Sequence, residues 1–235
     1  MLFSVSQFSR AEIVRLYGVP ADHVHVTVNG VDRLRFHPAP GGEAAVQALG
    51  LEPGRYVLTV GRLEPRKNHV ALLEAYSLLG ADAPPMVLIG QRDFGFEGVF
   101  DAIDRLALGA RVRVLDKVDD QALPAVMRHA ALFVYPAHAE GFGMPVAEAM
   151  ASGVPVVTAN TTSLPEVAGP GALTVSPGDV QALAQAMRRG LTEPALRQTL
   201  VAAADVHVGQ FNWAASAQVL LGAIRPFLHS KAAIT

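Results

Sequence analysis

The amino-acid sequence predicts an α/β fold built on a doubly wound parallel sheet. Short apolar runs alternate with longer helical patterns along most of the chain. The runs are continuous rather than alternating with polar residues, which is typical of strands covered by helices on both faces. Of the 235 residues, 51% are hydrophobic and 17% charged, enough for a large core. Strand, helix and strand repeated at short spacing, with right-handed crossovers, give the doubly wound arrangement.

Seven short apolar runs are the expected strands. In chain order they are Val24–Val28, Tyr56–Val60, Met86–Ile89, Val112–Leu115, Leu132–Tyr135, Val154–Thr158 and Leu173–Val175. The stretches between and after them carry helical periodicity. In chain order the expected helices are Gln7–Tyr17, Asn68–Leu79, Glu97–Leu108, Gln121–His129, Met144–Ser152, Val180–Gly190, Pro194–Val208 and Asn212–Leu228.

The two ends of the chain differ from the middle. Residues 1–42 form a connecting segment with one helix and one strand, ending in a Pro- and Gly-rich loop. Past Leu191 the sequence contains helical patterns and no run typical of a strand. We therefore expect residues 209–235 to form a helix that closes the domain.

Composition excludes several classes of protein. Lys and Arg number 19 and Asp and Glu 21, a formal charge of −2, whereas nucleic-acid-binding domains normally carry a basic excess. The absence of Cys rules out a disulfide scaffold, a thiol nucleophile and a Cys-ligated metal, and it fits a reducing cytoplasm. The N-terminus lacks the features of a signal peptide, and the longest charge-free run, 149–165, is interrupted by Gly and Pro. We therefore expect a cytoplasmic protein without a nucleic-acid partner.

Ligands are expected at the loops that follow the strands, because helix amino ends there carry unpaired N–H groups and partial positive charge. The loop 61–68 contains Gly61, Arg62 and Lys67 before a helix begins. A guanidinium can fork onto phosphate oxygens, and an ammonium adds a point charge. A solvated basic turn is the alternative interpretation. Gly90 follows the next strand and suits the close approach of a ligand, although a flexible turn also explains it.

The segment 136–157 carries the most informative pattern. Gly141 and Gly143 leave backbone N–H groups open at the amino end of an expected helix. Glu140 stands just before this helix, and Glu148 lies within it as the single charge of a long apolar stretch. A partly buried carboxylate needs hydrogen-bonding partners, which a ribose cis-diol would supply. The alternative is a lone Glu on the one wet stripe of a buried helix.

The loop 159–169 precedes another helix. Ser163 is expected to be the N-cap of that helix and Glu166 its third residue, as in a capping box. Four motifs of other enzyme classes are absent, and we expect no metal site. They are Asp-x-Asp of metal-dependent sugar transfer, His-x-x-x-His of zinc sites, Gly-x-Ser-x-Gly of serine hydrolases and Gly-x-Gly-x-x-Gly of nicotinamide dehydrogenases.

Together these motifs resemble the C-terminal, donor-binding half of the retaining GT-B glycosyltransferases of family 4. The resemblance extends over nearly the whole chain. Its most specific part is the pair Glu140 and Glu148, with seven residues between them around Gly-Phe-Gly-Met-Pro, which looks like the family's Glu-x7-Glu signature. Gly61-Arg62-Leu63 with Lys67-Asn68 looks like its diphosphate loop. Weaker matches are residues 4–9, 28–32, 164–167 and 211–213.

The resemblance implies a Rossmann-like nucleotide-sugar-binding domain over residues 1–235. It implies that Arg62 and Lys67 hold the donor diphosphate and that Glu140 contacts hydroxyls of the donor sugar, which makes these three the catalytic residues. The implied donor-binding residues are Gly61, the backbone of Phe142, Gly143 and Met144 at phosphate or sugar, Glu148 at the ribose diol, and Gly90 and Val118 beside the base. The pair Asp116-Lys117 departs from the family pattern near the base.

The implied reaction transfers a hexosyl group, such as mannosyl or glucosyl, from a UDP-, GDP- or ADP-sugar to a glycan or lipid acceptor. It proceeds with retention of configuration and needs neither a metal nor a cofactor. Peripheral association of the full enzyme with the inner face of the plasma membrane is a further expectation.

GT-B enzymes have two halves, and the chain is expected to lack the N-terminal acceptor domain and to transfer little sugar alone. The last helix should then expose an apolar face. Two alternatives remain open: a non-catalytic subunit that completes a split enzyme, and an epimerase or phosphorylase on the same fold. The candidates for the apolar face are Trp213, Val219, Leu220 and Leu221.

Overall fold

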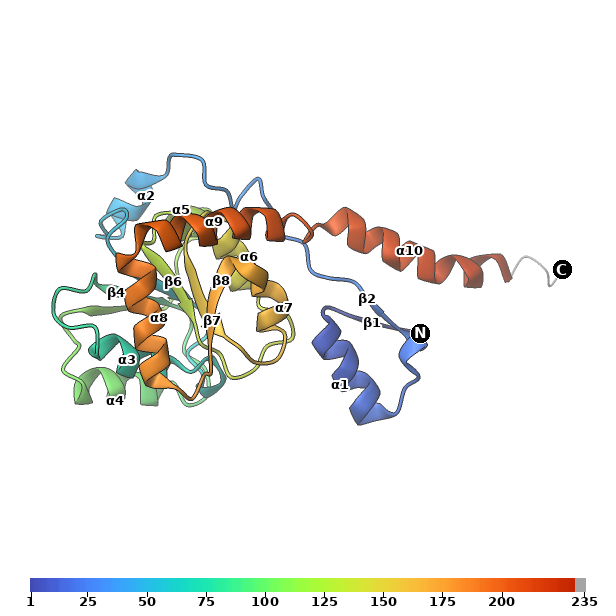
Figure 1. Ribbon diagram of the computed structural model, residues 1–235, viewed down its shortest axis with the longest axis horizontal. Coiled ribbons are helices and arrows are strands. Elements are labelled where there is room, and N and C mark those ends of the chain that lie inside the picture. The colour runs from blue at the N-terminus through green and yellow to red at the C-terminus, as the bar shows by residue number, and fades with distance from the viewer. Residues whose placement is uncertain (231–235) are drawn as a thin grey trace.

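The structure, a computed structural model, describes residues 1–230 (Figure 1). A six-stranded sheet forms its centre, with strand order β5-β4-β3-β6-β7-β8 and every neighbouring pair parallel. This order confirms the predicted doubly wound fold. The chain adds β4 and β5 on one side of β3, then returns to the centre and adds β6, β7 and β8 on the other side. The strands are β3 (Val57–Val60), β4 (Met86–Ile89), β5 (Val112–Leu115), β6 (Leu132–Tyr135), β7 (Val156–Ala159) and β8 (Ala172–Val175).

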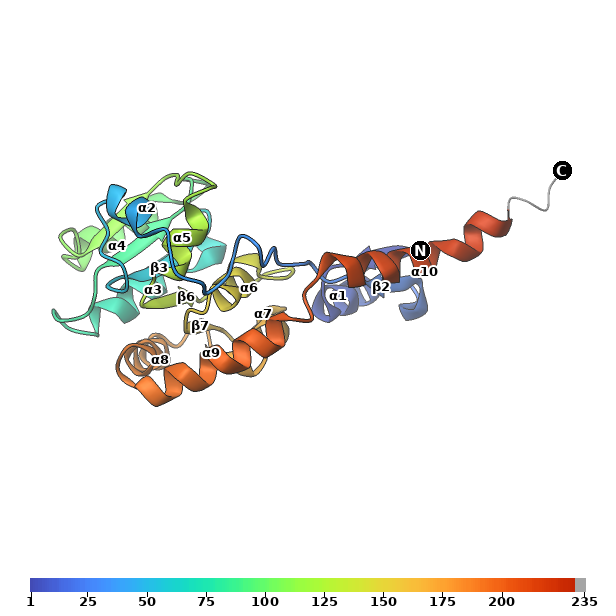
Figure 2. The same cartoon turned by 90° about the horizontal axis from the view of Figure 1, so that it is seen from above.

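Helices cover both faces of this sheet (Figures 1 and 2). Successive strand residues point to opposite faces, so that Leu58 and Phe133 belong to one buried cluster and Val57 and Leu132 to the other. The first face packs against α2 (Glu43–Ala48), α5 (Leu123–Arg128), α6 (Met144–Ala151), α7 (Leu164–Ala168) and α9 (Pro194–Val208). The second packs against α3 (His69–Ser77), α4 (Glu97–Arg105) and α8 (Val180–Thr192).

The two ends of the chain meet beside the main sheet. Strands β1 (Leu2–Ser4) and β2 (Val24–Val26) pair in parallel around α1 (Gln7–Tyr17), and α10 (Trp213–Ser230) runs past β2 and away from the body (Figure 2). A Cβ atom on Gly30 would lie 2.5 Å from the Trp213 ring, so this close approach requires glycine. Short 3-10 turns occur at Ala21–His23, Pro65–Lys67 and Gly169–Gly171.

Most predicted elements are confirmed, and β4, β5, β6, α1 and α9 have the predicted bounds. β1 and α2 were not predicted, because three and six residues are too few to show a period. The expected closing helix at 209–235 is α10, and its last five residues lie outside the described part of the chain.

The apolar face expected on the last helix is exposed. Relative exposures are 59% for Trp213, 43% for Val219, 38% for Leu220 and 49% for Leu221. None of the helices within residues 1–230 combines the length and the apolar character needed to cross a membrane.

Candidate functional site

A hollow of about 430 Å³ lies where the strand order reverses, between the carboxyl ends of β3 and β6. We call it the switch-point hollow. Open α/β sheets bind ligands at this position, because the loops on either side of the reversal run in opposite directions and leave a crevice. Its lining residues are Val5, Asn29, Gly61, Arg62, Glu64, Arg66, Lys67, Tyr135, Glu140, Phe142, Gly143, Met144 and Pro145.

The Glu140 carboxylate is the centre of a charged cluster in this hollow. Its Oε1 atom accepts hydrogen bonds from the Lys67 ammonium and, at 2.8 Å, from the Tyr135 hydroxyl. The Arg66 guanidinium lies 3.1 Å from the same oxygen. The side chains of Lys67 and Glu140 are only 10% and 12% exposed. No hydrogen bond from residues 1–230 reaches the second oxygen, Oε2.

Burial and nearby charge shift the pKa values of Arg66 and Tyr135 in this cluster. Burial alone would lower the pKa of Arg66, but the carboxylates of Glu140 and Glu64 raise it above its ordinary value. Burial, reinforced by the nearby Glu140 charge, raises the pKa of Tyr135. The phenol therefore stays protonated and the guanidinium charged at neutral pH.

The amino end of α6 faces the same hollow. Gly143 is its N-cap, in a left-handed conformation (φ 107°), and a Cβ there would lie 2.7 Å from Leu164. Pro145 occupies the first turn, as predicted. The N–H groups of Phe142, Gly143 and Met144 donate to no acceptor within residues 1–230. Free donors and the positive end of the helix dipole favour an anion at this point.

Hydroxyl groups fix the backbone of the loop 138–143. Ser163 donates to the carbonyls of Glu140 (2.9 Å) and Phe142 (2.8 Å), and the hydroxyl of Thr162 accepts the Glu140 N–H (3.0 Å). Thr161 donates to the carbonyl of His138. These bonds fix the loop backbone without using the N–H groups of Phe142, Gly143 and Met144, which line the hollow.

Ser163 is the N-cap residue of α7 and Glu166 its third residue, as predicted, but the hydrogen bonds of a capping box are absent among residues 1–230. The Ser163 hydroxyl makes no capping bond to α7, because the loop carbonyls described above take it. The Glu166 carboxylate instead accepts the backbone N–H groups of Gln7 (2.9 and 3.0 Å) and Phe8 (3.3 Å). It therefore caps α1, a helix more than 150 residues earlier in the chain.

The segment around α1 also contacts the loop directly. The hydroxyls of Ser6 and Ser9 both donate to the Gly141 carbonyl, at 2.6 and 3.0 Å. Glu166 and this carbonyl thus join the amino end of α1 to the edge of the switch-point hollow.

Two of the predicted residues occupy places that differ from expectation. Arg62 lines the hollow but is 68% exposed and pairs with Asp93 at 3.0 Å, which makes it a rim residue. A Cβ on Gly90 would lie 1.9 Å from the Gly61 carbonyl oxygen. Glycine at position 90 is therefore required by the close approach of the protein's own backbone at the ends of β3 and β4, whereas we expected the approach of a ligand.

Glu148 and Val118 are not among the residues that line the switch-point hollow. Glu148 is half-buried in α6, and burial raises its pKa to about 7, with Arg35 and Asp120 as charged neighbours. No hydrogen bond to its carboxylate comes from residues 1–230. Val118 packs partly buried against the first cluster.

Comparison with known proteins places this geometry in a family. The family model described as "Glycosyl transferases group 1" matches residues 43–207. The chain belongs to this glycosyltransferase family. The O-antigen chain mannosyltransferase B of Escherichia coli is 37% identical over 91% of this chain and 57% of its own length. A D-inositol 3-phosphate glycosyltransferase of Rhodococcus opacus is 32% identical over 91% of this chain and 50% of its own length.

Solved structures show the same architecture. The sucrose-phosphate synthase of Thermosynechococcus elongatus superimposes with a TM-score of 0.84 at 27% identity, over 97% of this chain and 58% of that one. Anabaena Alr3699/HepE in complex with UDP and glucose gives 0.85 at 25% identity, over 94% and 62%. The chain spans about half the length of these relatives. The predicted fold, the C-terminal half of a GT-B enzyme, is confirmed by these neighbours.

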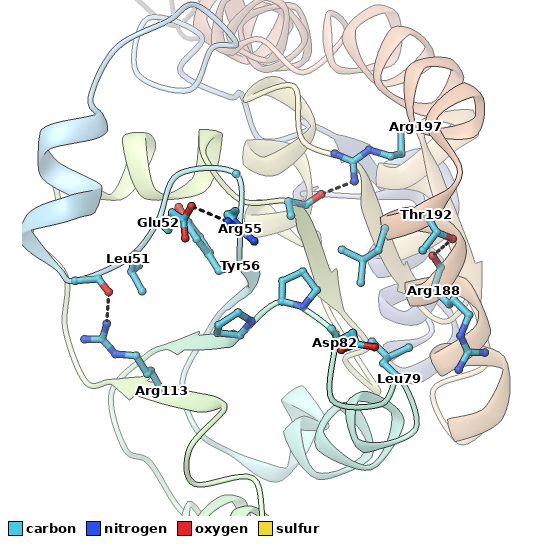
Figure 3. Close-up of a pocket in the computed structure, with 17 residues that line it drawn as sticks. Leu51, Glu52, Arg55, Tyr56, Leu79, Asp82, Arg113, Arg188, Thr192 and Arg197 are labelled. Atoms are coloured by element: carbon cyan, nitrogen blue, oxygen red, sulfur yellow. Dashed lines mark hydrogen bonds and ion pairs between the residues drawn. The ribbon is translucent and has the colours of Figure 1, made fainter.

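A larger hollow of about 930 Å³ lies at the opposite edge of the sheet of this glycosyltransferase-family chain (Figure 3). Arg113, Arg188 and Arg197 in its wall donate to main-chain carbonyls at 2.8–3.0 Å, including those at the carboxyl ends of α3 and α8. The arginines therefore complete helix ends. The carboxyl ends of the helices lie at the edge of a parallel sheet where its strands begin. Their partial negative charge disfavours an anion there.

Sequence reasoning missed two residues at the centre of the candidate site, Arg66 and Tyr135. Arg66 was passed over as one more charge in a basic loop, and Tyr135 as the last residue of a buried strand. The position of Tyr135 at a strand's carboxyl end was the available signal. Among residues 1–230, no three His, Asp or Glu side chains gather closely enough to hold a metal ion.

Proposed function

We propose that this chain is the donor-binding half of a retaining glycosyltransferase and that it binds a nucleoside-diphosphate sugar in the switch-point hollow. One observation carries the proposal: two cations, Lys67 and Arg66, line the same hollow as the free N–H groups at the amino end of α6. A diphosphate is the group that such an arrangement binds best, since it offers several anionic oxygens to several donors.

The chemistry follows from where charge develops. When the bond from the anomeric carbon to the diphosphate breaks, negative charge grows on the leaving phosphate. Lys67, Arg66, Arg62 at the rim and the N–H groups of Gly143 and Met144 would stabilise that charge, with no metal or cofactor. The Oε2 atom of Glu140, which has no hydrogen bond from residues 1–230, would accept a hydrogen bond from a hydroxyl of the donor sugar. Transfer with retention is proposed from the family resemblance.

The nucleoside is proposed to extend from the hollow along α6. Glu148 would accept the two hydroxyls of the ribose, which would supply the hydrogen bonds that its half-buried carboxylate lacks. Gly90 and Val118 are proposed beside the base. The mannosyltransferase relatives support a mannosyl donor first, and the UDP complex of the HepE neighbour supports testing uridine beside guanosine and adenosine.

The acceptor, a glycan or a lipid-linked glycan, is proposed to bind a part of the enzyme outside these 235 residues. The matched region is only 57% and 50% of the length of two relatives. The same proposal places the site in the cytoplasm, where nucleotide sugars are made, with the full enzyme at the inner face of the membrane. The exposed apolar face of α10 also fits the alternative of a separate subunit.

Calorimetric titration of this chain with GDP, UDP and ADP tests the proposal. At least one should bind, and Lys67→Met should weaken that binding tenfold or more, since a charge-assisted contact to phosphate is lost. Arg188→Met, in the opposite hollow, is the matched control and should bind as the wild type does. If none of the three nucleotides binds at millimolar concentration, the proposal is wrong.

A further inference from the structure

The Tyr135 side chain occupies the floor of the switch-point hollow with no role yet assigned. It is only 1% exposed, and its ring stacks on Phe133 with centroids 6.1 Å apart. The ring therefore has little freedom to move. Its hydroxyl accepts a hydrogen bond from Lys67 Nζ at 2.7 Å and donates to Glu140 Oε1 at 2.8 Å. A single neutral phenol thus satisfies a cation and an anion together.

A diphosphate in the hollow changes this arrangement. In the structure the Lys67 ammonium donates hydrogen bonds to Glu140 and Tyr135. A phosphate oxygen would compete for the ammonium hydrogens, because an ammonium has three donors and Lys67 has hydrogen bonds to only two partners among residues 1–230. As Lys67 turns toward the phosphate, Glu140 loses its nearest cation.

Two groups are then left to hold the Glu140 carboxylate. Arg66 is 44% exposed and shares its guanidinium between Glu140, Glu64 and a backbone carbonyl. Tyr135 is buried and donates its one proton to Glu140 alone. The phenol is thus the more rigid anchor for Oε1, and it leaves Oε2 without a hydrogen bond from residues 1–230.

We propose that Tyr135 is a positioning residue that keeps Glu140 oriented toward the donor sugar while Lys67 turns to the diphosphate. This inference rests on the proposed function. It separates two parts of donor affinity: the diphosphate part depends on Lys67 and the α6 amino end, and the sugar part depends on Glu140 held by Tyr135.

Tyr135→Phe tests this separation. The affinity for the nucleoside diphosphate should stay within about twofold of wild type. The additional affinity of the matching nucleotide sugar should fall about tenfold, since a hydrogen bond to a charged group is lost. Tyr76→Phe is the matched control: Tyr76 is fully buried, and its hydroxyl donates to the Pro84 carbonyl at 2.8 Å and interacts with Arg111, away from the hollow. It should change neither affinity.

A double-mutant cycle with Glu140→Gln gives a second measurement. If Tyr135 acts through Glu140, Tyr135→Phe should have no further effect on the sugar contribution in the Glu140→Gln background. If Tyr135→Phe weakens the nucleoside diphosphate and the nucleotide sugar by the same factor, or weakens neither, the inference is wrong. The proposed function would remain intact in both cases. Failure of the wild type to bind any nucleoside diphosphate would reject both.

Discussion

The Glu166 carboxylate accepts the backbone N–H of Gln7 with both of its oxygens, at 2.9 and 3.0 Å. This bond joins α7, beside the candidate donor loop, to the first turn of α1. An anionic group at a helix amino end satisfies donors that the helix itself cannot and also interacts favourably with the helix dipole. The two ends of a long chain segment are thereby held together at the site.

Glu166→Ala should therefore loosen α1. We expect the loss of about 1 kcal/mol of local stability and about fivefold faster hydrogen exchange at the Gln7 and Phe8 amides. Glu12→Ala removes a half-exposed carboxylate of α1 that pairs with Arg15, and it should leave both exchange rates unchanged. Unchanged exchange in Glu166→Ala would show that the cap does not stabilise α1.

Removing Lys67 alone should destabilise the protein more than removing both charges of the Lys67–Glu140 pair. Lys67→Met leaves a nearly buried carboxylate without its nearest cation, and we expect the free energy of unfolding to fall by about 2 kcal/mol. Adding Glu140→Gln removes the unpaired charge and should restore most of that stability without restoring nucleotide binding. Urea denaturation and calorimetry on the single and double variants check this. Recovery of binding in the double variant would contradict the role given to Lys67.

Glu148 should reduce stability at high pH. Its pKa is about 7 in the folded protein against 4.5 unfolded, so the unfolded chain ionises first as pH rises. The stability cost is absent below pH 4.5 and grows through pH 7, reaching about 2 kcal/mol at pH 8. Glu148→Gln should remove this cost, and raise the unfolding free energy at pH 8 by clearly more than at pH 5, where most of the cost is still absent.

The same substitution should weaken nucleotide binding tenfold or more, because the amide offers the ribose one acceptor oxygen where the carboxylate offers two. A residue that costs stability and supports binding is typical of a functional site. Denaturation at both pH values, with calorimetry at pH 8, measures the two effects. Stability and affinity that change in the same direction would favour a purely structural Glu148.

Gly90 should tolerate no side chain. Gly90→Ala places a Cβ 1.9 Å from the Gly61 carbonyl oxygen and should reduce the free energy of unfolding by about 2–4 kcal/mol. Gly178→Ala is the control, since a Cβ there meets nothing within 4 Å. Thermal denaturation of both variants measures the difference. A stable Gly90→Ala protein would show that β3 and β4 can separate at these ends.

The fold was predictable because its central strands are continuous apolar runs and most of its helices are long enough to show a helical period. The place of the site followed as well, since Lys67, Glu140 and the amino end of α6 meet at the reversal of strand order.

The partners of individual side chains were less predictable. Ser163 and Glu166 have the spacing of a local capping box, yet their hydrogen bonds go to Phe142 and Gln7, which tertiary folding brings near. Sequence spacing reports only local partners. The roles given to Gly90 and Tyr135 depended in the same way on contacts between separate strands.

The central claim is that a nucleoside diphosphate binds at the reversal of strand order. A crystal structure of the chain with the tightest-binding nucleotide tests it most directly. We predict terminal-phosphate oxygens within hydrogen-bonding distance of Lys67 Nζ and of the N–H groups of Gly143 and Met144. A nucleotide bound instead at the opposite edge, beside Arg113 and Arg188, would contradict the claim.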